Sequence, residues 1–152
     1  MKTIKTFFST NQQSWSLLIA RVALGVTILP HGIQKALGLL GGYGIEGTLG
    51  FFQSLGIPVV IGFMGILAEF VGSIALILGF GTRFMAFSLL LNLTGAMVLG
   101  GHLGNGFFMN WMGNQKGEGI EYFIMAIGLA IALLIGGSGK LSADNLIYNK
   151  LK

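Results

Sequence analysis

Charged and imidazole side chains lie inside stretches of this sequence that are otherwise apolar. Arg21, His31 and Lys35 fall within one such stretch, and Glu69 falls near the middle of the next. An ionisable group at membrane depth costs roughly 2.5–3.5 kcal/mol on insertion scales, so it normally faces a partner or a site inside a helical bundle. Ligand-binding or proton chemistry at these positions therefore depends on which other groups the fold brings to them.

Arg21 and Glu69 are predicted to form a buried polar pair. At 1.5 Å per residue, Arg21 lies about 9–10 Å from the cytoplasmic start of its helix, and Glu69 lies about 16 Å into its own helix from the outside. The long arginine side chain covers the remaining distance. Such a pair is either a proton or ligand site in mid-membrane or an architectural contact that fixes which helices are neighbours, and both interpretations stay open.

The other polar residues collect toward the outer ends of the apolar stretches. His31 and Lys35 lie in the outer third of the first stretch, His102 ends the third with Asn105 just beyond it, and Glu121 begins the fourth. Two histidines and a carboxylate that converge on one leaflet predict a ligand-binding pocket, in which a few polar groups fix the ligand within apolar walls. The competing interpretation is that each histidine is a hydrogen-bonded structural residue.

Metal and thiol chemistry have little support in the sequence. His31, His102 and Glu121 together could hold a metal ion or a haem, but no short ligand motif such as HxxxH or HxxE is present, and no metal site is predicted. The chain has no cysteine. This excludes a thiol–disulfide relay or a thiolate-bound metal made by this chain alone.

The composition is that of an integral membrane protein. Of 152 residues, 53% are hydrophobic and only 9% are charged, whereas soluble domains carry about 25% charged residues. The mean hydropathy is +0.80. The 26 glycines are typical of helices that approach closely in lipid. The net charge of +4 comes from scattered basic residues, so no nucleic-acid partner is predicted.

The hydrophobic pattern predicts an all-α chain folded as a single four-helix transmembrane bundle over residues 1–152. Its antiparallel hairpins would be formed by spans one and two and by spans three and four. A short interfacial helix is expected at Thr48–Leu55. The four expected spans are, approximately, residues 14–37, 58–80, 83–101 and 120–136.

The loop charges predict that both termini are cytoplasmic. Cytoplasmic loops carry an excess of lysine and arginine. Two basic residues, Lys35 and Lys116, fall on the other side of this topology. The basic residues on the side of the termini are Lys2, Lys5, Arg83, Lys140, Lys150 and Lys152.

Signature residues in a fixed order make the chain resemble the DoxX family of small four-helix bacterial membrane proteins. The resemblance extends through nearly the whole chain. It is carried by Arg21-x-x-x-Gly25, His31-Gly32-x-x-Lys35, Leu55-Gly56-Ile57-Pro58, Glu69-Phe70-x-Gly72, Gly79-x-Gly81-Thr82-Arg83, His102-x-x-Asn105-Gly106-Phe107-Phe108, Glu121-Tyr122 and Gly137-x-Gly139-Lys140-Leu141-Ser142-x-Asp144.

The resemblance implies a multi-pass protein of the bacterial inner membrane with a link to redox or oxidative-stress metabolism. Relatives include a subunit of a thiosulfate–quinone oxidoreductase and proteins that act with oxidative-stress enzymes. It therefore implies a quinone-like ligand and redox partner proteins, and leaves open whether the chain catalyses anything; if it does, it would be a quinone-linked oxidoreductase subunit. The alternative is a non-catalytic scaffold or small-molecule carrier whose polar network is structural. A homo-oligomer is compatible with either.

Overall fold

The computed structural model describes residues 8 and 10–150, which form helices and contain no strand. Three helices, α2, α4 and α5, are long and apolar enough to cross a membrane, and α6 is a shorter apolar helix of 16 residues. In chain order the elements are α2 (Trp15–Leu37), α3 (Gly44–Ser54), α4 (Val59–Leu78), α5 (Thr82–Leu99), the 3₁₀ helix η1 (His102–Asn105), α6 (Glu121–Gly136) and α7 (Ala143–Lys150).

Local sequence signals set the ends of the long helices. The hydroxyl of Ser14 accepts a hydrogen bond from the amide of Leu17 at 3.2 Å and caps the start of α2. Pro58 immediately precedes α4. Gly79 ends α4 with φ of +68°, a left-handed conformation that glycine adopts without a steric penalty. The short segment that follows turns the chain directly into α5.

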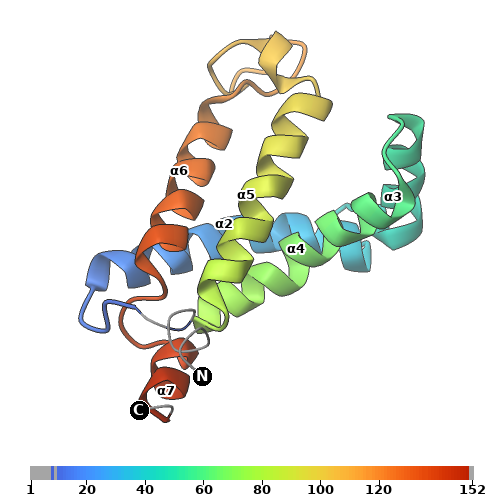
Figure 1. Cartoon of the computed structure of the whole chain (residues 1–152). Helices are drawn as coiled ribbons and strands as arrows, with labels where there is room; N and C mark the ends of the chain where they lie inside the picture. Colours follow the sequence, from blue (N-terminus) through green and yellow to red (C-terminus); the bar gives the residue numbers. More distant parts are fainter. Residues whose placement is uncertain (1–7, 9, 151–152) are drawn as a thin grey trace.

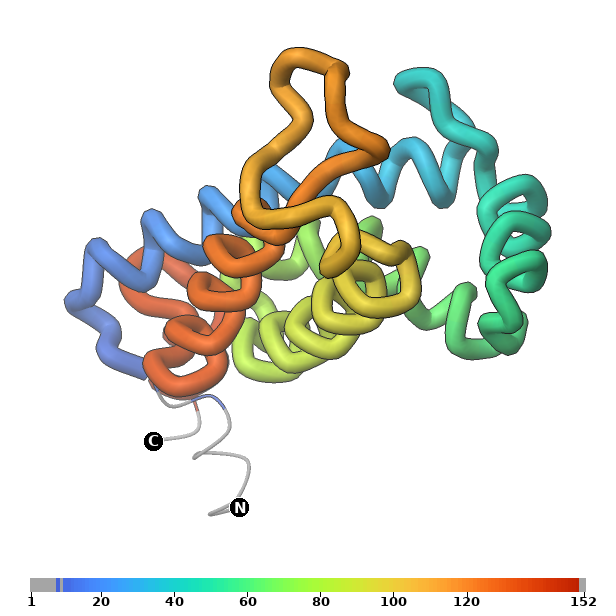
Figure 2. Tube along the Cα trace, turned by 90° about the horizontal axis from the view of Figure 1, so that it is seen from above, coloured from blue at the N-terminus to red at the C-terminus, as the bar shows by residue number. Residues whose placement is uncertain are grey.

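The long helices form two antiparallel pairs, α2 with α4 and α5 with α6 (Figure 1). The two pairs cross rather than run alongside each other, and Figure 2 shows α5 and α6 nearly end-on while α2 and α4 lie across the view. Helix α3 bridges the ends of α2 and α4 that lie away from α5 and α6. The expected hairpins are therefore present, but their relative orientation differs from that of four helices lying side by side.

One apolar core lies where the pairs meet. It contains leucines from each of the four helices, including Leu24, Leu76, Leu89 and Leu133, and none of these side chains is more than 1% exposed. Alanines with small side chains, such as Ala130, allow the helices to come close at this crossing. Most of the remaining hydrophobic side chains face outward, as they do in a protein surrounded by lipid.

Glycine brings α2 and α4 into backbone contact. A Cβ atom at Gly32 would lie 2.6 Å from the nitrogen and from the Cα of Phe70, and 2.7 Å from the carbonyl carbon of Glu69. A Cβ atom at Gly25 would likewise lie 2.9 Å from the carbonyl oxygen of Ser73. Both glycines are therefore required for this close packing, which places the side chains of α2 next to Glu69.

Candidate functional site

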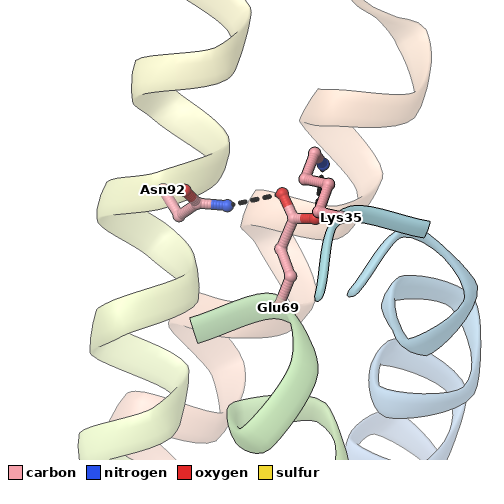
Figure 3. A network of polar contacts seen from close by, with 3 residues as sticks. All are labelled: Lys35, Glu69 and Asn92. Carbon is pink, nitrogen blue, oxygen red and sulfur yellow. Dashed lines mark hydrogen bonds and ion pairs between the residues drawn. The ribbon is translucent and has the colours of Figure 1, made fainter. Parts of the chain in front are cut away.

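Glu69 is the centre of a polar cluster that joins three helices. Its carboxylate forms a salt bridge with the ammonium group of Lys35 from α2, and its other oxygen accepts a hydrogen bond from the side-chain amide of Asn92 at 2.9 Å. Figure 3 shows Glu69 of α4 lying between these two partners. The Glu69 side chain is 9% exposed and that of Lys35 is 28% exposed. The carboxylate is thus shielded, while its cationic partner remains reachable.

The predicted pairing of Arg21 with Glu69 is wrong, although both residues are buried. The five N–H groups of the Arg21 guanidinium all donate to main-chain carbonyl oxygens, those of Leu76, Ile77, Ser138, Lys140 and Leu141. Glu69 lies two helical turns, or about 10 Å, from the first of these carbonyls. Lys35 is nearer to Glu69 because α2 and α4 touch at Gly32.

Arg21 and Asp144 fasten the helix ends near the α4–α5 turn. The last carbonyls of a helix have no partners within it and carry partial negative charge, and Arg21 binds two of these at the end of α4. The carboxylate of Asp144 accepts hydrogen bonds from the amides of Gly81 and Thr82 at 2.7 and 3.0 Å, at the start of α5. Asp144 is only 4% exposed. Both side chains therefore join helix ends through hydrogen bonds to the main chain.

His31 and Tyr122 border the Glu69 cluster. The two rings lie 6.4 Å apart, and the Glu69 carboxylate interacts electrostatically with both side chains. The Tyr122 hydroxyl is buried and has no hydrogen-bond partner among the described residues. His31 is exposed on α2, one turn before Lys35. Two helices therefore present polar groups around one buried carboxylate.

The other three predicted ligand-binding residues hold the loop between η1 and α6. Nδ1 of His102 lies 2.8 Å from the carbonyl oxygen of Glu118, and the side-chain amide of Asn105 donates to the same oxygen at 3.0 Å. The carboxylate of Glu121 accepts from the amide of Met109 at 3.3 Å. The structure thus divides the expected site: His31 and Lys35 lie at the Glu69 cluster, whereas these three bind the loop.

This loop positions the first turn of α6. The amide of Glu121 donates to the carbonyl of Phe107 at 2.9 Å. The His102 ring packs on Phe123 with centroids 4.7 Å apart, and Phe123 packs on Tyr122 at 5.5 Å. The loop residues therefore act on the Glu69 cluster indirectly, by holding Tyr122 in place.

Asn92 and Tyr122 belong to the cluster and were not predicted as site residues. Asn92 could have been recognised as a candidate, because its polar side-chain amide lies within the apolar run LLLNL of α5. Tyr122 had only its position next to Glu121, and a tyrosine at the start of an apolar helix is typical of a membrane interface. Neither signal identifies a partner on another helix.

Neither a group of metal ligands nor either of the two hollows described below coincides with the Glu69 cluster. Among residues 8 and 10–150, no three histidine, aspartate or glutamate side chains are grouped so that they could hold a metal ion. Two open hollows, of about 510 and 610 Å³, lie on the outer face of α2 and between the α4–α5 turn and α7. Their linings include none of the predicted ligand-binding residues.

An all-helical chain with three helices able to cross a bilayer, and a charged cluster shielded between them, is an integral membrane protein. The sequence model of the DoxX family matches residues 16–102, which is more than half of the chain. The protein therefore belongs to the DoxX family. The match covers Arg21, Lys35, Glu69 and Asn92 and ends before α6. No curated protein and no solved structure matches the chain.

Proposed function

We propose that this DoxX protein is a bacterial inner-membrane component of redox or oxidative-stress metabolism, and that it binds a quinone-like ring at the Glu69 cluster. Family membership supports the redox link. The cluster replaces the wider outer-leaflet pocket expected from the sequence, because His102, Asn105 and Glu121 already bond within their loop.

Unused hydrogen-bonding capacity at the cluster is the observation that carries this proposal. Neither ring nitrogen of His31 bonds to any residue within the described part of the chain, and the buried Tyr122 hydroxyl is likewise unpartnered there. The Lys35 ammonium has three N–H groups, and one of them is directed at Glu69. A quinone ring is apolar and has carbonyl oxygens, so it fits a site with a few donors between apolar helices.

The residues of the cluster would bind and orient the ring rather than carry electrons. A bound quinone would supply two-electron redox chemistry. Lys35 and His31 would donate hydrogen bonds to its oxygens, and Glu69 would hold the Lys35 ammonium in place. Because the chain has no cysteine, we propose that electrons reach the ligand through a redox partner protein.

The membrane topology in this proposal has four spans, α2, α4, α5 and α6, with both termini in the cytoplasm. The distribution of basic residues supports this orientation. Helix α6 is about 24 Å long, enough to cross most of the hydrocarbon core of about 30 Å. Activity of periplasmic and cytoplasmic reporters fused after residue 150 tests it: a C-terminal fusion active in the periplasm would refute the orientation.

The first test of ligand binding is to purify the protein in mild detergent and identify co-extracted small molecules by mass spectrometry. We expect a near-stoichiometric quinone, and a rise in melting temperature when a quinone analogue is added to stripped protein. His31→Ala should abolish the rise without unfolding the protein. Thr94→Val, on the exposed side of α5, is the control, because the Thr94 hydroxyl donates a hydrogen bond within its own helix, to the carbonyl of Leu90. Phospholipid alone, with no thermal response to quinones, would refute the proposal.

A second candidate function is a non-catalytic scaffold or carrier. The role of Arg21 and Asp144 favours it, because both signature residues are used entirely in joining helix ends. Under this alternative no ring compound co-purifies. A partner protein, or a second copy of the chain, would then cross-link to the exposed helix faces, and loss of the Glu69 cluster would lower stability without changing any ligand response.

A further inference from the structure

The hydroxyl of Tyr122 is a buried polar atom that has no hydrogen-bond partner among residues 8 and 10–150. A buried hydroxyl that lacks a hydrogen bond costs about 1–3 kcal/mol, so such atoms usually mark a missing ligand or water. The first turn of α6, which carries Tyr122, is fastened to the preceding loop through the amides of Ile120 and Glu121. Its position is therefore determined by the fold.

Tyr122 lies among aromatic rings and close to the charge of a buried carboxylate. Its ring packs against Phe123 and, at 6.4 Å, against His31. The charge of Glu69 also interacts with the tyrosine, but Glu69 does not accept a hydrogen bond from it. Both carboxylate oxygens of Glu69 already have donors, from Lys35 and Asn92. The tyrosine O–H is thus available to an acceptor supplied from outside the chain.

We infer that Tyr122 is the specificity-determining residue of the site, and that its hydroxyl donates a hydrogen bond to a ring oxygen of the bound ligand. This inference rests on the proposed function and deepens it. It assigns the site to rings that carry an oxygen substituent, and it predicts discrimination against an apolar ring of the same shape. Such discrimination arises because an apolar ring leaves the buried hydroxyl unpartnered.

The test compares 2-methyl-1,4-naphthoquinone with 2-methylnaphthalene, which have the same ring system and methyl group and differ in the two carbonyl oxygens. Dissociation constants are measured at one detergent concentration for the wild-type protein and for Tyr122→Phe. The absence of cysteine removes thiol addition to the quinone as a complication. Tyr43→Phe is the matched control, because Tyr43 is 83% exposed and directly precedes α3, a helix that lies away from α6 in Figure 1.

We expect Tyr122→Phe to weaken quinone binding by about tenfold, the range for one buried hydrogen bond, and to leave methylnaphthalene binding unchanged. The ratio of the two constants is the deciding quantity, because a purely structural effect of the substitution would weaken both ligands alike. An unchanged ratio in a variant that still binds quinone would overturn the role of Tyr122 and leave the proposed function standing. Failure of the wild-type protein to bind the quinone would refute both.

Discussion

Replacement of Gly32 by alanine tests whether close contact of α2 and α4 is what assembles the site. The added Cβ would lie 2.6 Å from two main-chain atoms of Phe70 and 2.7 Å from the carbonyl carbon of Glu69. Atoms in contact prefer separations of about 3.5–4.0 Å, so the helices would have to move apart by about 1 Å. Because all three atoms belong to the main chain, no change of rotamer removes the clash.

The expected cost follows from two opposing effects. Overpacking costs about 1–3 kcal/mol and reaches the upper part of this range when the neighbour is backbone. Alanine in a helix interior is more favourable than glycine by about 1 kcal/mol. We therefore expect Gly32→Ala to lower the free energy of unfolding by about 2 kcal/mol. Separation of the helices should also weaken the salt bridge between Lys35 and Glu69, and so the response to a quinone.

Gly95→Ala is the control for this experiment. Gly95 lies inside α5, and a Cβ atom there would meet nothing within 4 Å. This variant should be as stable as the parent or slightly more stable. Both variants are measured by equilibrium unfolding in mixed micelles with increasing fractions of sodium dodecyl sulfate. If Gly32→Ala is as stable as Gly95→Ala, the helix contact does not limit the geometry of the site and the reasoning fails.

Four further substitutions probe the polar contacts in the same unfolding assay. Arg21→Lys keeps the charge but offers three N–H groups where five are used, so we expect the free energy of unfolding to fall by about 2–4 kcal/mol. A fall below about 0.5 kcal/mol would show that the Arg21 hydrogen bonds do not hold the helix ends together. Glu69→Gln should lower the free energy of unfolding by about 1–2 kcal/mol, a loss limited by the partial exposure of Lys35. The double variant Glu69→Gln/Lys35→Met should regain part of that free energy, because it no longer leaves the Lys35 charge without its partner. Asp144→Asn replaces one of the two acceptor oxygens by a donor and should lower the free energy of unfolding by about 1–2 kcal/mol. Unchanged stability would show that the start of α5 does not depend on these hydrogen bonds.

The sequence was sufficient to predict the helices but not their crossing. Apolar runs of sufficient length identify each long helix, and glycine and proline mark the ends, as at Pro58 and Gly79. The relative orientation of the two helix pairs depends on which small residues face each other. Gly32 could be recognised as a notch on α2, but its contact with the backbone of Phe70 is a property of the assembled pair.

The candidate site could likewise be predicted only in part, because contacts between helices are a property of the assembled structure. The sequence identifies polar residues in apolar helices, and any such group needs a partner. Their partners were not predictable from depth alone. Lys35 reaches Glu69 because the backbones of α2 and α4 touch. Arg21 instead donates to main-chain carbonyl groups, and because every residue has such a group, the sequence does not indicate which of them it binds. Likewise His102 looked like a ligand residue, yet its acceptor is the main chain of Glu118.

The contacts of Arg21 also bear on how the protein is made. Arg21 lies in the first long helix, whereas three of its five carbonyl partners lie at residues 138–141, which are synthesised more than a hundred residues later. Until those residues emerge from the ribosome, a guanidinium group inside a newly inserted helix lacks most of its acceptors. During that interval the guanidinium group needs other hydrogen-bond acceptors, such as water or lipid headgroups. Completion of the Arg21 contacts is therefore a late event in synthesis that depends on the chain following α6.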